Sequence, residues 1–222
     1  MTNNTSLSTA EYAHKVRALG LPVDRDGIFS PVDVAGGRLR TMFGEHPRGY
    51  LLGTTGMISQ LRDEYGVQHD GDDPQFVLVG FDKDLTYERL QRASEFVNGR
   101  VPYYLTHVDL ACPTRKGPIP DCGALGAVIR ATTGRDMDDH FGKPGRWMAE
   151  HVREHLAGDR AVLVAGDRLY TDIALGHAIG ADTVLVLSGE SNHERLAAWD
   201  GRPPTHVADT LAEFLECHST TR

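Results

Sequence analysis

Short apolar runs alternate with helix-like stretches along most of the chain. The runs typical of buried strands fall at 49–53, 75–82, 102–109, 161–167 and 182–189. The segments with apolar residues at helical spacing are 55–66, 85–99, 122–134, 142–158, 171–180 and 210–217. Because strands that alternate with helices pair in parallel, this rhythm predicts an α/β fold with a parallel sheet.

The first predicted helix lies close to the N-terminus. Ser8 or Thr9 can cap a helix that Gly20 ends, with Tyr12 and Val16 on its apolar face. In an alternating chain this helix is expected to have a strand on each side.

Composition and charge narrow the class of protein. A chain of 222 residues with 40% hydrophobic positions can form one or two globular domains. The formal charge is -8, and no basic cluster offsets it, so neither nucleic acid nor an anionic membrane is an expected partner. Three cysteines without C-x-x-C spacing, at 112, 122 and 217, do not indicate disulfides or structural zinc. Without an apolar run of about 20 residues or a signal peptide, we expect a cytoplasmic protein.

Two carboxylates follow the apolar run at 161–167. The run ends in Gly166-Asp167, and Asp172 begins the next predicted helix. Open parallel sheets bind ligands at the carboxyl ends of their strands, and carboxylate oxygens suit Mg²⁺. The alternative is that Asp167 is a turn residue and Asp172 is a helix N-cap.

Two further segments carry groups that can bind a phosphate. Lys143 lies in a Gly-Lys-Pro loop ahead of a helix, where its charge could neutralise a phosphoryl group, although most loop lysines are simply solvated. Thr2, Asn3 and Asn4 place a hydroxyl and two amides just ahead of the first helix. Such groups bind phosphate well near a helix N-terminus, and helix capping explains them equally.

Together and in this order, TNN at 2–4, GKP at 142–144 and GDRLYTDI at 166–173 resemble the haloacid dehalogenase superfamily of phosphohydrolases. With DCGAL at 121–125 and TVLVLSG at 183–189, the whole chain is similar to its class IIA branch, the NagD-like or 4-nitrophenylphosphatase-like phosphatases. The resemblance implies a Rossmann-like parallel-sheet core formed by residues 1–29 and 138–222. It also implies an inserted α/β cap domain, residues 30–137, that closes over the core and selects the substrate.

The resemblance assigns roles to the residues that match these motifs. Thr2 corresponds to the phosphate-binding hydroxyl, with Asn3 and Asn4 lining the same loop. Lys143 corresponds to the lysine that binds the phosphoryl group, so Thr2 and Lys143 are the implied catalytic residues. We expect Lys143 to contribute to phosphate binding more than to folding.

The metal and the cap loop follow from the same resemblance. Asp167 corresponds to a magnesium ligand, and Asp172 to a second carboxylate that supports the metal site. His107 and Asp109 fall in the stretch where the family places its specificity residues, and both can hydrogen-bond a leaving group. The alternative is that these two residues only fix the loop.

One departure from the family pattern concerns the nucleophile. The family begins with a strand that ends in D-x-D-G, whose first Asp attacks phosphorus and whose second is the general acid. This sequence starts on the TNN motif. Its D-x-D-G, from Asp24 to Gly27, follows a helix with no room for a buried strand, so we interpret it as a polar loop. We therefore expect the first core strand to be absent from this chain.

The implied function is a magnesium-dependent phosphomonoesterase. Its substrate would be a small sugar phosphate, nucleotide or similar metabolite, cleaved through an aspartyl-phosphate whose Asp lies outside this chain. The alternative is a catalytically inactive phosphate-binding or regulatory pseudo-phosphatase. A dinucleotide-binding enzyme has little support, because no G-x-G-x-x-G follows a strand. The assembly that the resemblance leaves open is a homodimer formed through the cap domain.

Overall fold

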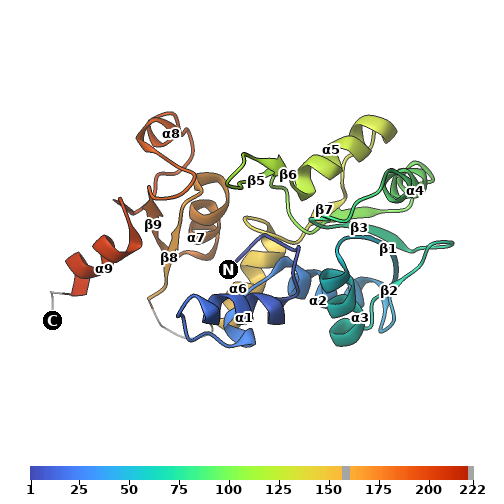
Figure 1. The fold of residues 1–222 in the computed structure, drawn as a ribbon, viewed down its shortest axis with the longest axis horizontal. Coiled ribbons are helices and arrows are strands. Elements are labelled where there is room, and N and C mark those ends of the chain that lie inside the picture. The colour runs from blue at the N-terminus through green and yellow to red at the C-terminus, as the bar shows by residue number, and fades with distance from the viewer. Residues whose placement is uncertain (157–160, 220–222) are drawn as a thin grey trace. The chain divides into compact units, whose positions relative to one another are not determined.

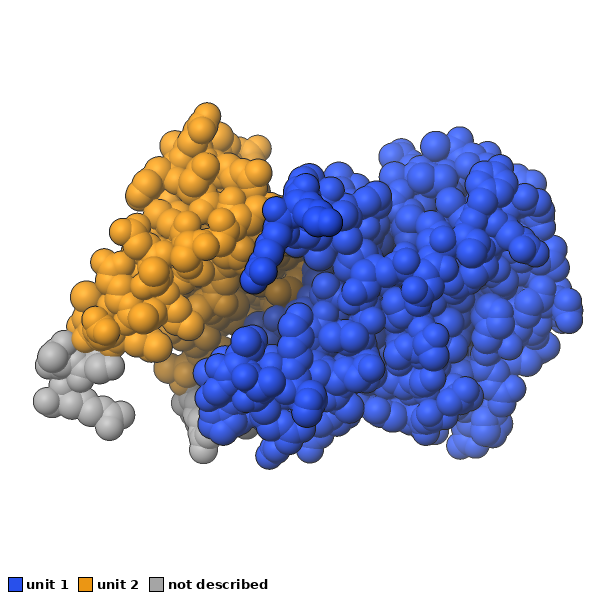
Figure 2. Space-filling view, in the orientation of Figure 1, with its two compact units in different colours: residues 1–142 blue, residues 143–222 orange. Residues whose placement is uncertain are grey.

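The computed structural model describes residues 1–156 and 161–219 and divides into two compact units. The first unit is Met1–Gly142 and the second is Lys143–Arg222 (Figure 1 and Figure 2). Each unit has its own parallel sheet, which confirms the predicted α/β class. Residues 1–29 belong to the same compact unit as residues 30–137, and the predicted boundaries of core and cap stay a prediction.

The first unit is built on a five-stranded sheet in which every pairing is parallel. Its strand order is β2-β1-β3-β4-β7, which is the order of a doubly wound sheet. The strands are β1 (Arg48–Leu52), β2 (Gln68–His69), β3 (Phe76–Val79), β4 (Tyr103–Leu105) and β7 (Asp139–His140). Every residue of β3 is buried, as expected of a central strand covered on both faces.

Helices cover both faces of this sheet (Figure 1). Helices α2 (Pro31–Phe43) and α3 (Thr55–Tyr65) lie on one face, and α4 (Tyr87–Asn98) and α5 (Cys122–Thr133) lie on the other. Alternate strand residues such as Leu52, Val77 and Val79 pack with Val97 of α4 and Ile129 of α5 in one buried cluster. An antiparallel hairpin, β5 (Ala111–Cys112) and β6 (Ile119–Pro120), precedes α5.

The first helix, α1 (Thr9–Ala18), begins and ends where its sequence predicts. Ser8 forms a capping box with Glu11, and Gly20 follows the helix with a φ of 90°. The strands expected on each side of α1 are wrong: residues 1–8 form a loop, and η1 (Arg25–Gly27) and α2 follow the helix. Polar groups of this loop form hydrogen bonds with residues after the strands of the first unit, described below, instead of pairing with a neighbouring strand.

The second unit has a three-stranded parallel sheet in the order β10-β9-β8. Its strands are β8 (Leu163–Gly166), β9 (Asp182–Val186) and β10 (His206–Ala208). Its helices are α6 (Arg146–His155), the π-helical η2 (Leu169–Ile173), α7 (Ala174–Ile179), α8 (His193–Ala197) and α9 (Leu211–Ser219). Leu169, Ile173 and Leu185 form a small buried cluster, whereas Leu163 on the edge strand β8 is 43% exposed.

Within residues 1–156 and 161–219, no helix combines the length and the apolar character needed to cross a bilayer.

Candidate active site

An N-terminal segment, residues 3–6, lies across the carboxyl ends of three neighbouring strands of the first unit. Just after β1, the Thr54 hydroxyl donates to the Ser6 carbonyl at 3.2 Å. Just after β3, the Phe81 amide donates to Thr5 Oγ1 at 2.9 Å, and just after β4 the Thr106 hydroxyl lies 3.3 Å from Thr5 Oγ1. The chain's own N-terminal segment therefore occupies the sheet edge at which doubly wound folds bind ligands.

The predicted phosphate loop is shaped by hydrogen bonds of its own side chains. Thr2 Oγ1 accepts from the Asn4 amide at 3.2 Å, and Asn4 Oδ1 accepts from the Ser6 amide at 3.0 Å. The Thr2 amide donates to the Phe29 carbonyl at 3.0 Å. Asn3 is buried, while Thr2 and Asn4 are half-buried. These turns hold the Thr2 hydroxyl in a fixed loop, as a phosphate-binding group requires.

The predicted cap residues lie beside this loop. Asn3 Nδ2 donates to Asp109 Oδ2 at 3.2 Å, which ties the phosphate loop to the loop after β4. His107 is fully buried, with Nδ1 3.0 Å from Thr106 Oγ1 and Nε2 2.8 Å from Asp121 Oδ1. These contacts fix the loop, and direct contact of His107 or Asp109 with a substrate stays a prediction.

Asp121 is a functional candidate that the sequence reasoning missed. It caps α5, because its Oδ1 accepts from the Cys122 amide at 2.7 Å. The ligand atoms of Asp121, His107 and Asp109 all lie within 4.8 Å of one another, and all three residues are buried. The signal available in the sequence was an aspartate directly before a helical segment, which indicates only a cap.

In the second unit the structure brings Lys143 and Asp172 together. Lys143 Nζ lies 2.6 Å from Asp172 Oδ1, and the two side chains are only 9% and 10% exposed. Asp172 Oδ2 accepts from the Arg168 amide at 3.2 Å. A Cβ on Gly166 would lie 2.2 Å from Asp172 Cβ, so only glycine allows this close approach. Asp172 therefore orients Lys143 as its counter-ion.

Asp167 follows β8 and is held by the loop after β9. Its Oδ2 accepts from the Glu190 amide at 2.8 Å, and its carbonyl accepts from the Ser191 amide at 3.1 Å. A Cβ on Gly189 would lie 2.2 Å from Asp167 Oδ2, so glycine is required there as well. A half-buried carboxylate at the end of a parallel strand has the hard oxygen chemistry that suits Mg²⁺.

The two predicted metal residues differ in how their oxygens are engaged. Both oxygens of Asp172 already have partners, Lys143 Nζ and the Arg168 amide. The bond from Glu190 engages Oδ2 of Asp167. Asp167 thus fits the role of a metal ligand, and a supporting role of Asp172 at the metal stays a prediction.

The D-x-D-G segment is a polar loop, as interpreted from the sequence. It forms η1, and Asp24 and Asp26 are exposed. Its arginine is the residue with a buried partner: Arg25 Nη2 lies 2.7 Å from Asp33 Oδ1 and also pairs with Glu64. This segment therefore does not present a carboxylate at the end of a buried strand.

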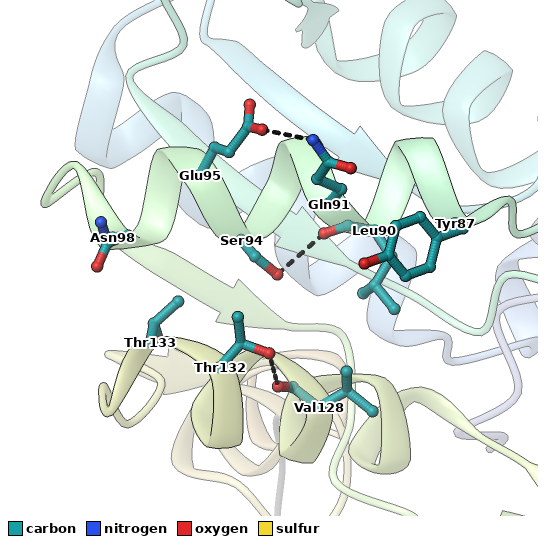
Figure 3. Close-up of a pocket in the computed structure, with 9 residues that line it drawn as sticks. All are labelled: Tyr87, Leu90, Gln91, Ser94, Glu95, Asn98, Val128, Thr132 and Thr133. Carbon is teal, nitrogen blue, oxygen red and sulfur yellow. Dashed lines mark hydrogen bonds between the residues drawn. The ribbon is translucent and has the colours of Figure 1, made fainter.

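A groove of about 340 Å³ lies between α4 and α5 (Figure 3). Its lining includes Tyr87, Leu90, Ser94, Val128 and Thr132. None of its nine described lining residues is basic, and its one charged residue is Glu95. The groove therefore lacks the charge needed to hold a phosphate.

Comparisons with known proteins identify the relatives of this chain. A family model described as HAD-hydrolase-like matches residues 140–214. The chain is 30% identical to the 5'-nucleotidase YutF of Bacillus subtilis, over 97% of this chain and 83% of that protein. It is 26% identical to a dihydroxyacetone phosphatase of Corynebacterium glutamicum, over 98% of this chain and 78% of that protein.

Solved structures agree with these relatives. A 4-nitrophenylphosphatase from Thermotoga maritima matches with a TM-score of 0.89 and 36% identity, over 96% of this chain and 81% of that one. A glycerol phosphate phosphatase from Mycobacterium tuberculosis, solved in complex with magnesium, matches with a TM-score of 0.86 and 26% identity, over 95% of this chain and 65% of that one. The chain therefore belongs to the haloacid dehalogenase-like phosphatases, in the class IIA branch of NagD and 4-nitrophenylphosphatase type.

Proposed function

We propose that this chain is a magnesium-dependent phosphomonoesterase that acts on a small phosphorylated metabolite. The observation that carries the proposal is the buried ion pair of Lys143 and Asp172, beside Asp167 at the carboxyl end of β8. Burying a lysine costs free energy, and a binding site for a phosphate dianion is a place where that charge is used. The relatives' names, a 5'-nucleotidase and a dihydroxyacetone phosphatase among them, support small phosphate esters as the substrate class.

Each residue then has a part in binding and charge stabilisation. Lys143 neutralises phosphoryl oxygens as a point charge, and Asp172 holds its ammonium group in place. By its resemblance to the family's phosphate-binding loop, the Thr2 hydroxyl would donate a hydrogen bond to the phosphate, and Asp167 would hold Mg²⁺. When bound, Mg²⁺ supplies charge stabilisation at the phosphoryl oxygens. The family's D-x-D-G nucleophile has no counterpart among the described residues, because Asp24 and Asp26 are exposed at η1.

Binding of inorganic phosphate in the presence of Mg²⁺ tests the proposed site. We expect Lys143→Ala to weaken phosphate affinity at least about tenfold, because it removes a desolvated charge–phosphate contact. Lys116→Ala, at an exposed loop lysine, is the matched control and should leave the affinity unchanged. Isothermal titration calorimetry on samples shown by circular dichroism to be folded provides the measurement. Equal affinity in the two variants would show that Lys143 does not bind the phosphate.

The second candidate is a phosphate-binding protein without turnover, which the exposed position of Asp24 and Asp26 favours. This second candidate predicts at most trace hydrolysis of 4-nitrophenyl phosphate with Mg²⁺, because covalent catalysis needs a nucleophile. Release of 4-nitrophenolate, followed by absorbance, is the measurement. Robust turnover that Asp24→Asn abolishes would instead make the D-x-D-G segment the nucleophile.

A homodimer through residues 30–137 is part of the proposal. Apolar exposure beside the α4–α5 groove supports it, since Tyr87 is 82% exposed and Val128 is 46% exposed. Sedimentation velocity of the parent and of Val128→Glu measures the assembly, and an unchanged monomer in both would contradict it.

A further inference from the structure

We propose that His107, Asp109 and Asp121 form a site for a divalent transition-metal ion within the first unit. Their ligand atoms lie within 4.8 Å of one another, and the residues are 0%, 3% and 4% exposed. One imidazole and two carboxylates are a donor set that binds ions such as Mn²⁺, Co²⁺ and Zn²⁺. The proposal does not depend on the proposed phosphatase function.

Two rigid elements bring the three residues together. His107 and Asp109 follow β4 directly, and Asp121 is the N-cap of α5. The first turn of α5 packs closely on the loop, because a Cβ on Gly123 would lie 2.3 Å from the Val108 carbonyl oxygen. The donor atoms therefore sit on a fixed frame at the carboxyl end of a central strand.

The spacing of the donor atoms of His107 and Asp121 suits a metal ion. His107 Nε2 lies 2.8 Å from Asp121 Oδ1. Ligand bonds of about 2.1 Å place neighbouring donors ~3.0 Å apart in octahedral geometry and ~3.4 Å apart in tetrahedral geometry. The pair is therefore close to octahedral spacing before any ion binds. An ion would take the place of the proton between His107 and Asp121, and a neutral imidazole can hold that proton on Nδ1 instead.

The surrounding hydrogen bonds are those that orient metal ligands. Thr106 Oγ1 lies 3.0 Å from His107 Nδ1, and a hydroxyl can accept a proton from that nitrogen or donate one to it. His107 can thus carry its proton on Nδ1 and direct the Nε2 lone pair to an ion. Asn3 Nδ2 donates to Asp109 Oδ2 at 3.2 Å and fixes that carboxylate. Thr106 and Asn3 thus hold His107 and Asp109 in the way that hydrogen-bond partners of metal ligands do.

Electrostatics supports the same conclusion. Asp109 and Asp121 are two carboxylates that are both more than nine-tenths buried, with ligand atoms less than 5 Å apart. Two buried like charges at this separation repel each other, and a divalent cation between them offsets both. The competing interpretation is an ion-free hydrogen-bond network that only fixes the loop, and the experiment separates the two.

Direct titration of the chelator-treated full chain with Mn²⁺ and with Co²⁺, in excess Mg²⁺ that fills the proposed site at Asp167, tests the site. We expect one Mn²⁺ or Co²⁺ per chain in the parent, and d–d absorption of the Co²⁺ complex that reports its geometry. Asp121→Asn keeps an N-cap residue and should weaken Mn²⁺ binding at least about tenfold. Asp109→Asn should act in the same direction.

Three controls locate the ion. His14→Gln, at an exposed histidine, and Asp167→Asn, at the proposed Mg²⁺ ligand, should leave Mn²⁺ affinity unchanged. The double variant His151→Gln/His155→Gln removes a histidine pair on α6 that could chelate an ion, whose rings are 4.3 Å apart. Affinity that is lost in this double variant, or unchanged in both aspartate variants, overturns the proposal.

A second measurement uses the parent protein alone. Mn²⁺ at the site should broaden the NMR signals of the His107 and Cys122 amides at substoichiometric concentration. This result does not require that either aspartate variant folds. Unbroadened signals at these amides in the presence of bound Mn²⁺, or no binding above background, would show that the cluster is an ion-free network.

Discussion

At the residue scale, the ion pair of Lys143 and Asp172 changes what is expected of Lys143. The Gly-Lys-Pro sequence predicted a loop lysine that serves phosphate binding more than folding. The structure instead buries Lys143 Nζ 2.6 Å from Asp172 Oδ1, so that removing the lysine leaves a buried carboxylate without its cation. Sequence could predict both positions from strand and helix ends, but not this contact, because its partners are 29 residues apart.

Lys143→Ala is therefore expected to lower stability as well as phosphate affinity. We expect the free energy of unfolding to fall by about 3 kcal/mol, because Asp172 keeps a buried uncompensated charge. Urea unfolding of the second unit, followed at signals of residues 163–186, measures the change. Adding Asp172→Asn should recover part of the loss. A change below about 0.5 kcal/mol would show that the pair is solvent-screened.

The Cys122 thiol offers a test of burial at the same scale. Complete burial raises its pKa to about 12, and at pH 8 only about one thiol in ten thousand is then ionised. We expect the exposed Cys217 to react rapidly with a disulfide reagent and Cys122 to react only after unfolding in urea. Cys122→Ser identifies the late thiol. Rapid native reaction of all thiols would contradict the burial of Cys122.

At the element scale, Asp33 joins four segments of the first unit. Its carboxylate accepts hydrogen bonds from Thr9 of α1, Arg25 of η1, and Gln60 and Tyr65 of α3, at 2.7 to 2.9 Å. Sequence patterns predicted the ends of α1, since Ser8 and Gly20 act through neighbours along the chain. They could not predict the Asp33 network, whose partners lie 8 to 32 residues away.

Replacing Asp33 should loosen these elements together. We expect Asp33→Ala to lower the free energy of unfolding by about 3 kcal/mol or more, because Thr9, Gln60 and Tyr65 lose their hydrogen-bond acceptor. Asp24→Ala, in the neighbouring exposed segment, is the matched control and should change it by less than about 0.5 kcal/mol. Chemical denaturation of both variants is the measurement, and equal effects would contradict the role of the network.

At the scale of the whole molecule, the alternation of strands and helices predicted parallel pairing correctly, but it does not say which strands are central and which are edges. Apolar runs such as 76–79 and 163–166 look alike in sequence. The structure distinguishes them, since β3 pairs with strands on both sides while β8 is an edge of its three-stranded sheet. The residues of an apolar run do not indicate whether the strand will pair with another strand on one side or on both.

This difference should appear in amide hydrogen exchange. We expect peptides over β3 to remain protected much longer than peptides over β8, because the four residues of β3 are fully buried whereas Leu163 is 43% exposed. Exchange followed by mass spectrometry at neutral pH gives the comparison, with β9 as the paired strand of the second unit. Slower exchange in β8 than in β3 would contradict the expectation.

Residues 3–6, which cross the carboxyl ends of β1, β3 and β4, act as an intramolecular ligand of this sheet edge. Thr5 and Ser6 make the contacts that a bound molecule would otherwise make at this edge. The exposed stretch at 19–22 is the tether, and a short tether keeps its ligand at an effective concentration of the order of millimolar. Cutting the chain there would turn folding of this edge into a bimolecular binding equilibrium, so residues 1–20 would be released on dilution and could be supplied again as a separate peptide.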